Sequence, residues 1–212
     1  MKISVEPVIN LLHAAHFSAL ATHSTAVPGY PYVTVVPNVL DEAHRPILLV
    51  STLAEHTRNL QIDRRVSLLV TEPNSLNPQT AARLSLVGDV EPFEPDEFLR
   101  KRYLRYVLDA EQYVQLDFLF FRIQPKRIRY IAGIGKMGWV EAAEFLAAPS
   151  VVSDIEHDLI QSARTQLPNH IRIMGIDPFG IDYEADGFRD RFAFEEIGDL
   201  DTQVTAAIPQ LS

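Results

Sequence analysis

Short segments rich in apolar and β-branched residues run along the first two thirds of the chain, a pattern typical of β-strands. The predicted strands span residues 17–23, 32–36, 47–50, 66–71, 82–91, 118–123 and 128–132. Polar turns and loops rich in Pro, Gly, Asn and Ser separate several of them, and few helices intervene. The pattern favours a mostly antiparallel sheet that closes into a barrel over a Rossmann-type arrangement.

Apolar residues recur at helical spacing near the N-terminus, where Val8, Leu11 and Ala15 share one face of a predicted helix over residues 5–16. Further helices are predicted at residues 55–63 and 95–107. Beyond a boundary near residues 147–150, a helix, three short strands and a closing helix are predicted at residues 151–167, 170–174, 180–184, 189–194 and 200–208. This tail is near the lower size limit for independent stability, so we expect it to pack on the barrel.

These patterns predict an α+β protein, mostly β with flanking helices. Residues 1–148 would form a barrel domain, and residues 149–212 a small C-terminal α/β domain with a helix and a hairpin. The composition agrees, because 47% of the 212 residues are hydrophobic and 22% are charged, as in a globular protein with a substantial core.

Charge and cysteine content exclude several classes of function. The chain has no cysteine, which excludes disulfides, thiolate nucleophiles and Cys-ligated metal centres. The net charge of −9 disfavours binding to nucleic acid. The sequence contains neither an apolar run of about 18 residues nor a secretory signal, so we predict a cytoplasmic protein without a membrane partner.

The strongest local signal is the turn from Ser51 to Asn59, where an apolar strand ends in two hydroxyl residues and a helix begins at once. Helix N-termini carry free N–H groups and a partial positive charge, which suit a phosphate. Ser51, Thr52 and His56 could add donors. An alternative stays open, because Thr52 and Glu55 have the spacing of a capping box, which would satisfy the same N–H groups without a ligand.

A glycine-rich segment and one strand give two weaker signals. Three glycines between Tyr130 and Trp139 would let the backbone approach a ligand, while Lys136 could pair with an anion and Trp139 could cover a planar ring. Because no clear helix follows, a turn with Trp139 as a packing anchor is the favoured interpretation of the segment taken alone. The strand 32–36 could pair its backbone edge with the amide edge of a flat ring, or could be a plain barrel strand.

None of the seven histidines stands in a metal-binding pattern such as H-E-x-x-H. His13 and His16 lie three residues apart on the first predicted helix, but no carboxylate pattern accompanies them, so a structural or surface role is favoured. We therefore predict no metal site. No nucleophile elbow or P-loop lysine occurs, and no side chain stands out as a catalytic acid or base.

The order of these segments along the chain gives them weight. The run from Pro28 to Pro37, the turn from Ser51 to Asn59, residues 82–88 and residues 133–139 together resemble the pyridoxamine phosphate oxidase-like split-barrel proteins. The resemblance is greatest to the branch of HugZ-type haem-degrading proteins, and it covers residues 9–194. Residues 174–180 are similar to the small C-terminal domain of that branch.

The resemblance implies a six-stranded antiparallel split β-barrel that forms a homodimer and binds FMN at the dimer interface. The FMN phosphate would lie near the strand-to-helix turn and the ring along strand 32–36, with further contributors reaching across the dimer. The implied cofactor-binding residues are Tyr32, Val33, Thr34, Val36, Ser51, Thr52, His56, Thr57, Asn59, Arg83, Lys136 and Trp139.

The chain departs from the family pattern at two places. Glu55 and His56 occupy the neighbourhood in which pyridoxamine phosphate oxidases hold the FMN phosphate with an Arg-Lys pair, so we expect modest FMN affinity. HugZ-type proteins ligate haem iron through a histidine near the C-terminus, whereas no histidine follows His170 here. Residues 154–159 also lack the Met-Asn-x-Asp-His segment of that branch, so haem ligation by the family's route is not expected.

Three functions are consistent with these residues. The first, which the sequence favours, is an FMN-dependent oxidoreductase, a flavoprotein in which the flavin carries the redox chemistry. The second is a HugZ-type haem-binding or haem-degrading protein. The third is a non-enzymatic split-barrel binding module with a vestigial cofactor site. The substrate, the electron donor and the electron acceptor stay open.

Overall fold

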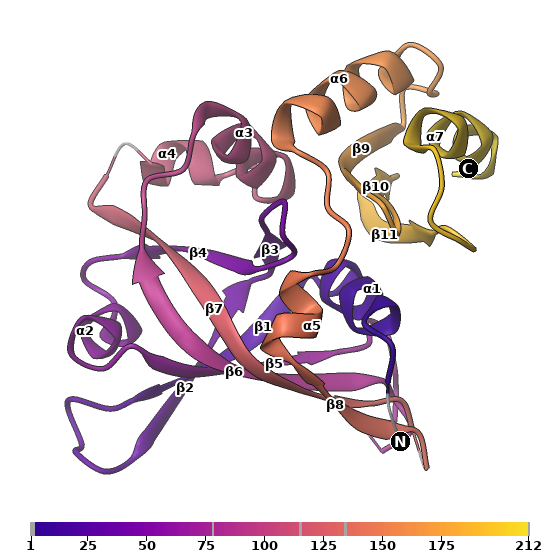
Figure 1. Ribbon diagram of the computed structural model, residues 1–212. Coiled ribbons are helices and arrows are strands. Elements are labelled where there is room, and N and C mark those ends of the chain that lie inside the picture. Colours follow the sequence, from indigo (N-terminus) through magenta and orange to yellow (C-terminus); the bar gives the residue numbers. More distant parts are fainter. Residues whose placement is uncertain (1–2, 78, 115, 134, 212) are drawn as a thin grey trace.

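The computed structural model describes residues 3–77, 79–114, 116–133 and 135–211. Its largest element is an eight-stranded antiparallel sheet with the order β2-β1-β5-β6-β7-β4-β3, in which β8 pairs with β7 (Figure 1). The strands are β1 (Phe17–His23), β2 (Pro31–Pro37), β3 (Val39–Leu40), β4 (Pro46–Ser51), β5 (Arg65–Thr71), β6 (Arg83–Pro92), β7 (Phe118–Ile131) and β8 (Met137–Glu141). The predicted α+β, mostly β fold class is confirmed.

Strand β7, 14 residues long, is the strand about which the sheet bends into a half-barrel. Its first half pairs with β4 and its second half with β8, while β6 pairs along nearly its whole length. The ladder shifts register between Val87 and Gly88, opposite Pro125, which has no N–H to donate. One continuous strand therefore pairs with β4 at one end of the barrel and with β8 at the other.

Helix α1 (Glu6–Ala14) closes the interior of the half-barrel. Its Val8, Ile9 and Leu12 are fully buried in one cluster with strand residues such as Leu68 and Leu86. Burial of each large apolar side chain contributes roughly 1.5–3 kcal/mol. This cluster is therefore the main core of the barrel and fixes the position of α1.

Four further helices pack on the outside of the barrel. They are α2 (Glu55–Ile62), α3 (Glu97–Tyr106), α4 (Ala110–Val114) and α5 (Ala142–Leu146). Helix α2 packs against β1 and β2. Helix α3 packs over β4 and β7 through a second apolar cluster, in which the rings of Tyr103 and Phe120 meet edge to face at 5.4 Å.

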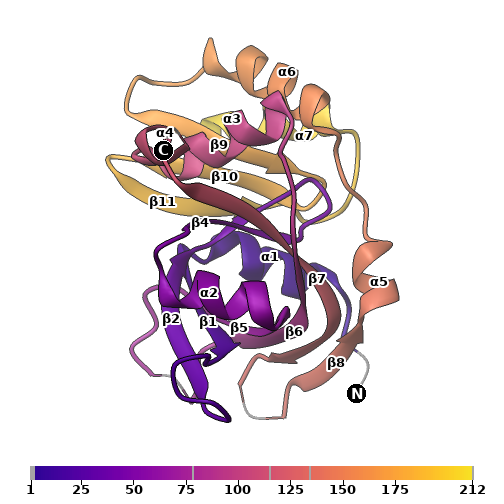
Figure 2. The same cartoon turned by 90° about the vertical axis from the view of Figure 1, so that its left-hand side faces the viewer.

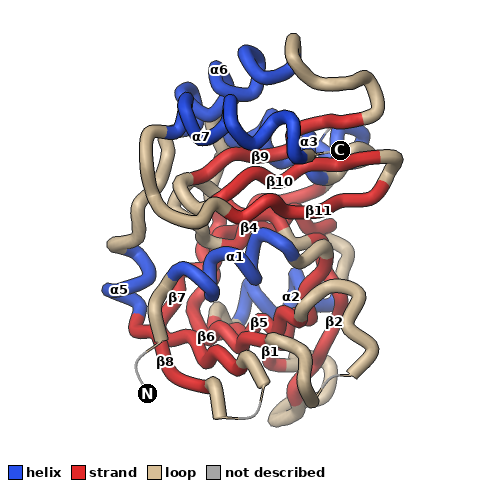
Figure 3. The backbone as a smooth tube through the Cα atoms, turned by 90° about the vertical axis from the view of Figure 1, so that its right-hand side faces the viewer, coloured by secondary structure: helices blue, strands red, loops and turns tan. Residues whose placement is uncertain are grey.

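The C-terminal residues form a separate three-stranded antiparallel sheet with the order β11-β10-β9. Its strands are β9 (Ile171–Asp177), β10 (Gly180–Ala185) and β11 (Phe188–Ala193), and its helices are α6 (Ser153–Arg164), α7 (Leu200–Ala207) and a 3₁₀ turn (Ile208–Gln210). Helices α6 and α7 cover one face, whereas α1 lies between this sheet and the barrel (Figure 3). The C-terminal unit thus packs on the barrel, as expected (Figure 2).

Most predicted elements are present within a few residues of their expected bounds. Strands β3 and β8 were not predicted, and the strands predicted at residues 118–123 and 128–132 are one strand. The sheet therefore has eight strands where the resemblance implied six. The division into domains 1–148 and 149–212 stays a prediction. Within the described ranges, no helix is both long and apolar enough to cross a membrane.

Candidate functional site

The predicted phosphate turn is built differently from the expectation. Helix α2 begins after Ala54, which is extended, and no side chain caps it. Thr52 does not form the alternative capping box, because the N-cap position belongs to Ala54. The N–H of Thr52 donates to the carbonyl of Asp117 (2.9 Å), which holds Thr52 at the end of the strand ladder. The hydroxyl of Ser51 accepts from the N–H of Leu53 (3.2 Å). The capping-box alternative is therefore wrong.

Thr57 and Asn59 face the protein interior and not a ligand, since both are fully buried. The Thr57 hydroxyl donates to the carbonyl of Ser51 (2.6 Å). Asn59 accepts from the N–H and the hydroxyl of Thr25 (2.9 and 2.8 Å), and its Nδ2 donates to the hydroxyl of Thr22 (3.0 Å). These bonds tie α2 to β1 and to the loop before β2, so both side chains are already engaged.

The residues of β2 alternate between outside and inside. Val33 and Val35 point outward and are 60% and 67% exposed, whereas Val36 belongs to the core and is 4% exposed. Tyr32 and Thr34 are half-buried. Val36 therefore contributes no side chain to a surface site, while Val33 and Val35 are available to one.

The glycine-rich segment forms the hairpin between β7 and β8. The N–H of Ala132 donates to the carbonyl of Lys136 (2.8 Å). Gly133 and Gly135 have φ of 94° and 79°, a conformation that glycine adopts without strain. Ile134 lies outside the described residues. The glycines are explained by the turn, and Lys136 stands exposed at its end.

Trp139 lies on β8 with its ring 43% exposed. The guanidinium groups of Arg127 and Arg129 on β7 lie 4.3 and 5.2 Å from the ring centre, within the range of cation–π attraction. Arg83 lies at the start of β6, where its Nη1 donates to the carbonyl of Ala81 (3.3 Å). Trp139 is thus held by two arginines on a solvent-exposed surface.

The strand register places several of these residues on one outer face of the sheet. Two cross-strand rows run Val35–Ala19–Leu69–Ser85–Arg129–Trp139 and Val33–Ala21–Ser67–Val87–Arg127–Glu141. We call the surface formed by these two rows the outer face. Ser51 pairs with Phe118 at the start of β7, whereas Trp139 pairs with Arg129, 11 residues further along the same strand. A strand segment of this length spans up to roughly 35 Å. One chain therefore does not gather the predicted residues into one pocket.

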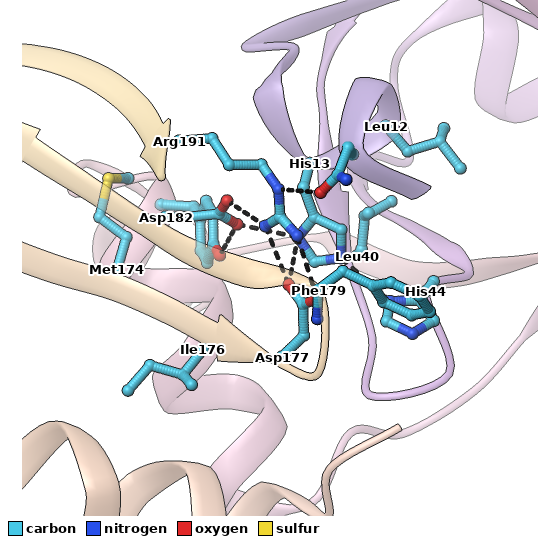
Figure 4. Close-up of polar contacts among 12 residues, drawn as sticks. Leu12, His13, Leu40, His44, Met174, Ile176, Asp177, Phe179, Asp182 and Arg191 are labelled. Carbon is cyan, nitrogen blue, oxygen red and sulfur yellow. Dashed lines mark hydrogen bonds and ion pairs between the residues drawn. The ribbon is translucent and has the colours of Figure 1, made fainter. Parts of the chain in front are cut away.

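A buried group of ionisable side chains, not predicted from the sequence, joins the barrel to the C-terminal sheet (Figure 4). We call it the histidine–carboxylate cluster. It consists of His13 on α1, His44 between β3 and β4, Asp177 on β9, Asp182 on β10 and Arg191 on β11. Each side chain is almost completely buried. Buried charges persist only when they are paired and hydrogen-bonded.

Hydrogen bonds fix the protons of the two histidines. His44 Nε2 lies 2.8 Å from the carbonyl of Pro149, which can only accept, so His44 carries its proton on Nε2. Its Nδ1 then accepts from His13 Nε2 (3.0 Å), and His13 Nδ1 donates to Asp182 Oδ2 (2.8 Å). His13 thus donates from both ring nitrogens and is the imidazolium cation.

The charges of the cluster balance, with His13 and Arg191 facing Asp177 and Asp182. Arg191 Nη1 lies 2.9 Å from Asp177 and 2.6 Å from Asp182. Burial alone would raise the pKa of Asp177, but the charges of Arg191 and His13 outweigh it and hold that pKa at about 2. The same two cations hold the pKa of Asp182 well below its usual range. Burial, with the charge on His13, lowers the pKa of His44 to about 4.

Ring nitrogens of His13 and His44 and a carboxylate oxygen of Asp177 lie within 4.8 Å of one another, close enough to share a metal ion. Each of these ring nitrogens, however, has a hydrogen-bond partner, and Arg191 already supplies positive charge to Asp177. The geometry is that of a closed ion-pair network, and we assign no metal to it.

A family model described as CREG, beta-barrel matches residues 9–147, which is the barrel up to α5. The chain belongs to the CREG β-barrel family. Two solved structures share this fold over nearly the whole chain. The protein Atu2129 of unknown function from Agrobacterium tumefaciens is 24% identical with a TM-score of 0.75, over 98% of this chain and 94% of its own. The heme binding protein from Mycobacterium smegmatis is 24% identical with a TM-score of 0.65, over 100% and 96%.

Two curated relatives of this CREG-family chain are named as heme oxygenases. It is 35% identical over 133 residues to the chloroplastic non-canonical heme oxygenase HOZ of Arabidopsis thaliana, a match that covers 61% of this chain and 40% of HOZ. It is 28% identical over 117 residues to the heme oxygenase HutZ of Vibrio cholerae, covering 51% of this chain and 65% of HutZ. The chain thus spans less than two thirds of either relative's length.

These relatives correct the expected cofactor of the CREG-family chain. The sequence favoured an FMN-binding flavoprotein, whereas the matched relatives are named for haem, which supports the HugZ branch of the resemblance. The structure gives a physical reason, because Thr57 and Asn59 are engaged internally. Desolvation also lowers the pKa of the half-buried His56, which removes a cation from the turn at neutral pH. FMN as the main cofactor is therefore wrong.

Proposed function

We propose that this protein binds haem and degrades it. The observation that carries the proposal is the 35% identity over 133 residues to the heme oxygenase HOZ. The second match, to HutZ, supports it. Because the chain spans 40% of HOZ and 65% of HutZ, the activity is carried over as a proposal.

We place the haem on the outer face, because that surface offers what a flat dicarboxylate ring requires. Val35 and Trp139 offer apolar contact for the plate. Arg129 offers a charged donor for a carboxylate, and so do the N–H groups of Arg127 that its ion pair with Glu141 (2.8 Å, through Nε) does not use. His23 at the end of β1 is exposed and on the same side as Ala19 and Ala21 of the two rows, so its imidazole is the axial ligand we propose.

The same face supports a homodimer as the assembly that binds haem. Exposed apolar side chains that are continuous across several strands mark interaction surfaces. On the outer face these are Val33, Val35, Leu69, Val87 and Trp139. A two-fold pairing through this face would cover them and would enclose a haem between two copies. The dimer also explains why one chain alone leaves the predicted residues far apart.

Haem titration of the purified protein tests the proposal. The wild type should give a saturable Soret band, and His23→Ala should shift its position or lower the affinity for haem. His170→Ala is the matched control, because His170 is exposed in the C-terminal unit, and it should titrate like the wild type. If the wild type gives only the broad spectrum of unbound haem, this function is wrong. If both variants retain the wild-type spectrum, the axial role of His23 is wrong.

A further inference from the structure

A cleft of about 590 Å³ opens between α3, α6 and the start of β9. Figure 1 shows α3 on the barrel side and α6 on the C-terminal side of this junction. Small-molecule sites typically occupy 300–1,000 Å³ and often lie where two structural units meet. The cleft lies away from the outer face, so it is independent of the proposed haem site.

The walls of this cleft carry positive charge in an acidic protein. Lys101, Arg105, Arg164 and Arg172 line it, which is four of the chain's 19 Lys and Arg residues. Among the described residues that line it there is no carboxylate. The whole chain has a net charge of −9, so this local group of cations has the opposite sign to the chain as a whole. Clefts lined by one sign of charge concentrate ligands of the opposite sign.

The ion pairs behind the walls do not cancel this charge. Lys101 contacts Glu97 (2.6 Å) on the exposed surface, and Arg172 contacts Glu184 (3.0 Å). Arg105 (3.0 Å) and the buried Arg102 share the single carboxylate of Glu156. Within the described part of the chain, the side chain of Arg164 has no ion-pair partner. The five cations Lys101, Arg102, Arg105, Arg164 and Arg172 thus face three carboxylates, an excess of two positive charges.

The remaining lining is mostly apolar. Ile160 and Ile173 are buried side chains whose surfaces reach the cleft, and Leu104 and Leu108 continue this surface toward solvent. Leu108 is 65% exposed at the rim. A ligand with an apolar body and an acidic end would match both parts of the lining, since its body covers the leucines and isoleucines while its charge meets the arginines.

We propose that this cleft binds a small amphiphilic carboxylate. The proposal does not rest on haem binding, because it uses only the cleft between α3 and α6. Carboxylates of this kind include linear acyl chains and planar tetrapyrroles, and both share the chemistry that the cleft recognises. Arg164 is the unpaired cation that binds the acidic end, and Leu108 packs against the apolar body.

Calorimetric titration of the full chain with dodecanoate and with metal-free protoporphyrin IX tests this inference. Dodecanol serves as the uncharged analogue of dodecanoate. Arg164→Glu should weaken binding of the carboxylate by about tenfold, the loss expected for one charge-assisted hydrogen bond. Leu108→Glu should weaken it as well, and neither variant should unfold, because both residues are exposed. Arg58→Glu on the exposed face of α2 makes the same charge change outside the cleft and should bind like the wild type.

Binding of dodecanoate alone would assign the cleft to acyl chains, and binding of the porphyrin alone to tetrapyrroles, provided that Arg164→Glu weakens it. The inference is overturned if neither carboxylate binds, if dodecanol binds as tightly as dodecanoate, or if Arg164→Glu and Arg58→Glu behave alike. None of these results depends on the titration of His23, so failure here and failure of the haem proposal are distinguishable.

Discussion

At the scale of single residues, His44 is unusual because it is an ionisable group kept neutral in the interior. Its Nδ1 accepts from the cation His13, and its Nε2 donates to the carbonyl of Pro149. A proton added to His44 would face His13 and Arg102 as like charges. The folded state therefore resists protonation of His44, whereas the unfolded chain does not.

This difference predicts a loss of stability in mild acid. The pKa of His44 is about 4 in the folded protein and 6.5 for an ordinary histidine, so between these values the unfolded state binds more protons and stability falls as pH falls. From pH 6.5 to 4 the free energy of unfolding should drop by roughly 3 kcal/mol from this group. Urea unfolding at several pH values measures it.

The variant His44→Asn is the control for that measurement. His44 has a positive φ of 61°, which asparagine adopts more readily than most residues. The variant should be less stable at pH 7 and should lose less stability than the wild type between pH 6.5 and 4. Parallel pH curves for the two proteins would show that His44 does not titrate in this way.

The same residue scale shows why the sequence could not reveal the cluster. His13 and Asp182 are 169 positions apart, so no local pattern around the histidine contains the carboxylate that pairs with it. His13 on an apolar helix face was the one available signal. At the predicted turn, Thr57 and Asn59 were expected near a phosphate, but the fold directs both side chains inward, which the local sequence does not reveal.

At the scale of elements, local patterns were sufficient wherever a strand is apolar and bounded by turns. The strands at residues 17–23 and 65–71 and the helix α3 are close to their expected bounds. Strand β8 was missed because glycines precede it and, among the described residues, it pairs along one side only, with the second half of β7. Pro125 was interpreted as a break between two strands, but the bulge at Gly88 accommodates it within one strand. A bulge that depends on the neighbouring strand leaves no pattern in the sequence of either strand alone.

The bulge itself gives a prediction for one glycine. A Cβ on Gly88 would lie 2.3 Å from the carbonyl oxygen of Gln124, a backbone atom that cannot move without disturbing β7. Gly88→Ala should therefore lower the free energy of unfolding by about 1–3 kcal/mol. Denaturant unfolding followed by circular dichroism measures this loss.

Gly198→Ala provides the comparison for Gly88→Ala. Its new Cβ would meet only the flexible side chain of Gln203, at 3.3 Å or more, and its φ is not in the left-handed region. It should change stability by less than about 0.5 kcal/mol. An equal effect of the two substitutions would argue against a special role for the bulge.

At the scale of the whole molecule, two surfaces differ in character from the rest of this acidic chain. The outer face exposes several apolar side chains and carries Trp139 next to two arginines, whereas the cleft between α3 and α6 is basic. The family match covers the barrel with the outer face and stops at residue 147. The histidine–carboxylate cluster then fixes the C-terminal sheet, and with it α6, against α1 of the barrel.

The proposed homodimer predicts the effect of a charge on the outer face. Val35→Arg places a cation among the exposed apolar side chains at the β2 end of the outer face and should convert a two-chain particle into a single chain by light scattering. Leu76→Arg is the matched control, because Leu76 is fully exposed in a loop outside this face, and it should leave the dimer intact. A wild-type protein that is already a single chain would contradict the proposed assembly.

Degradation of bound haem tests the central claim most directly. Haem-loaded protein is mixed with a reductant in air, and the Soret absorbance is followed together with the release of iron to a chelator. The account predicts that the Soret band is lost and iron is released much faster than for the same haem on serum albumin, and that excess FMN does not substitute for haem. Loss of the Soret band at the albumin rate, or a protein that binds FMN and no haem, would contradict it.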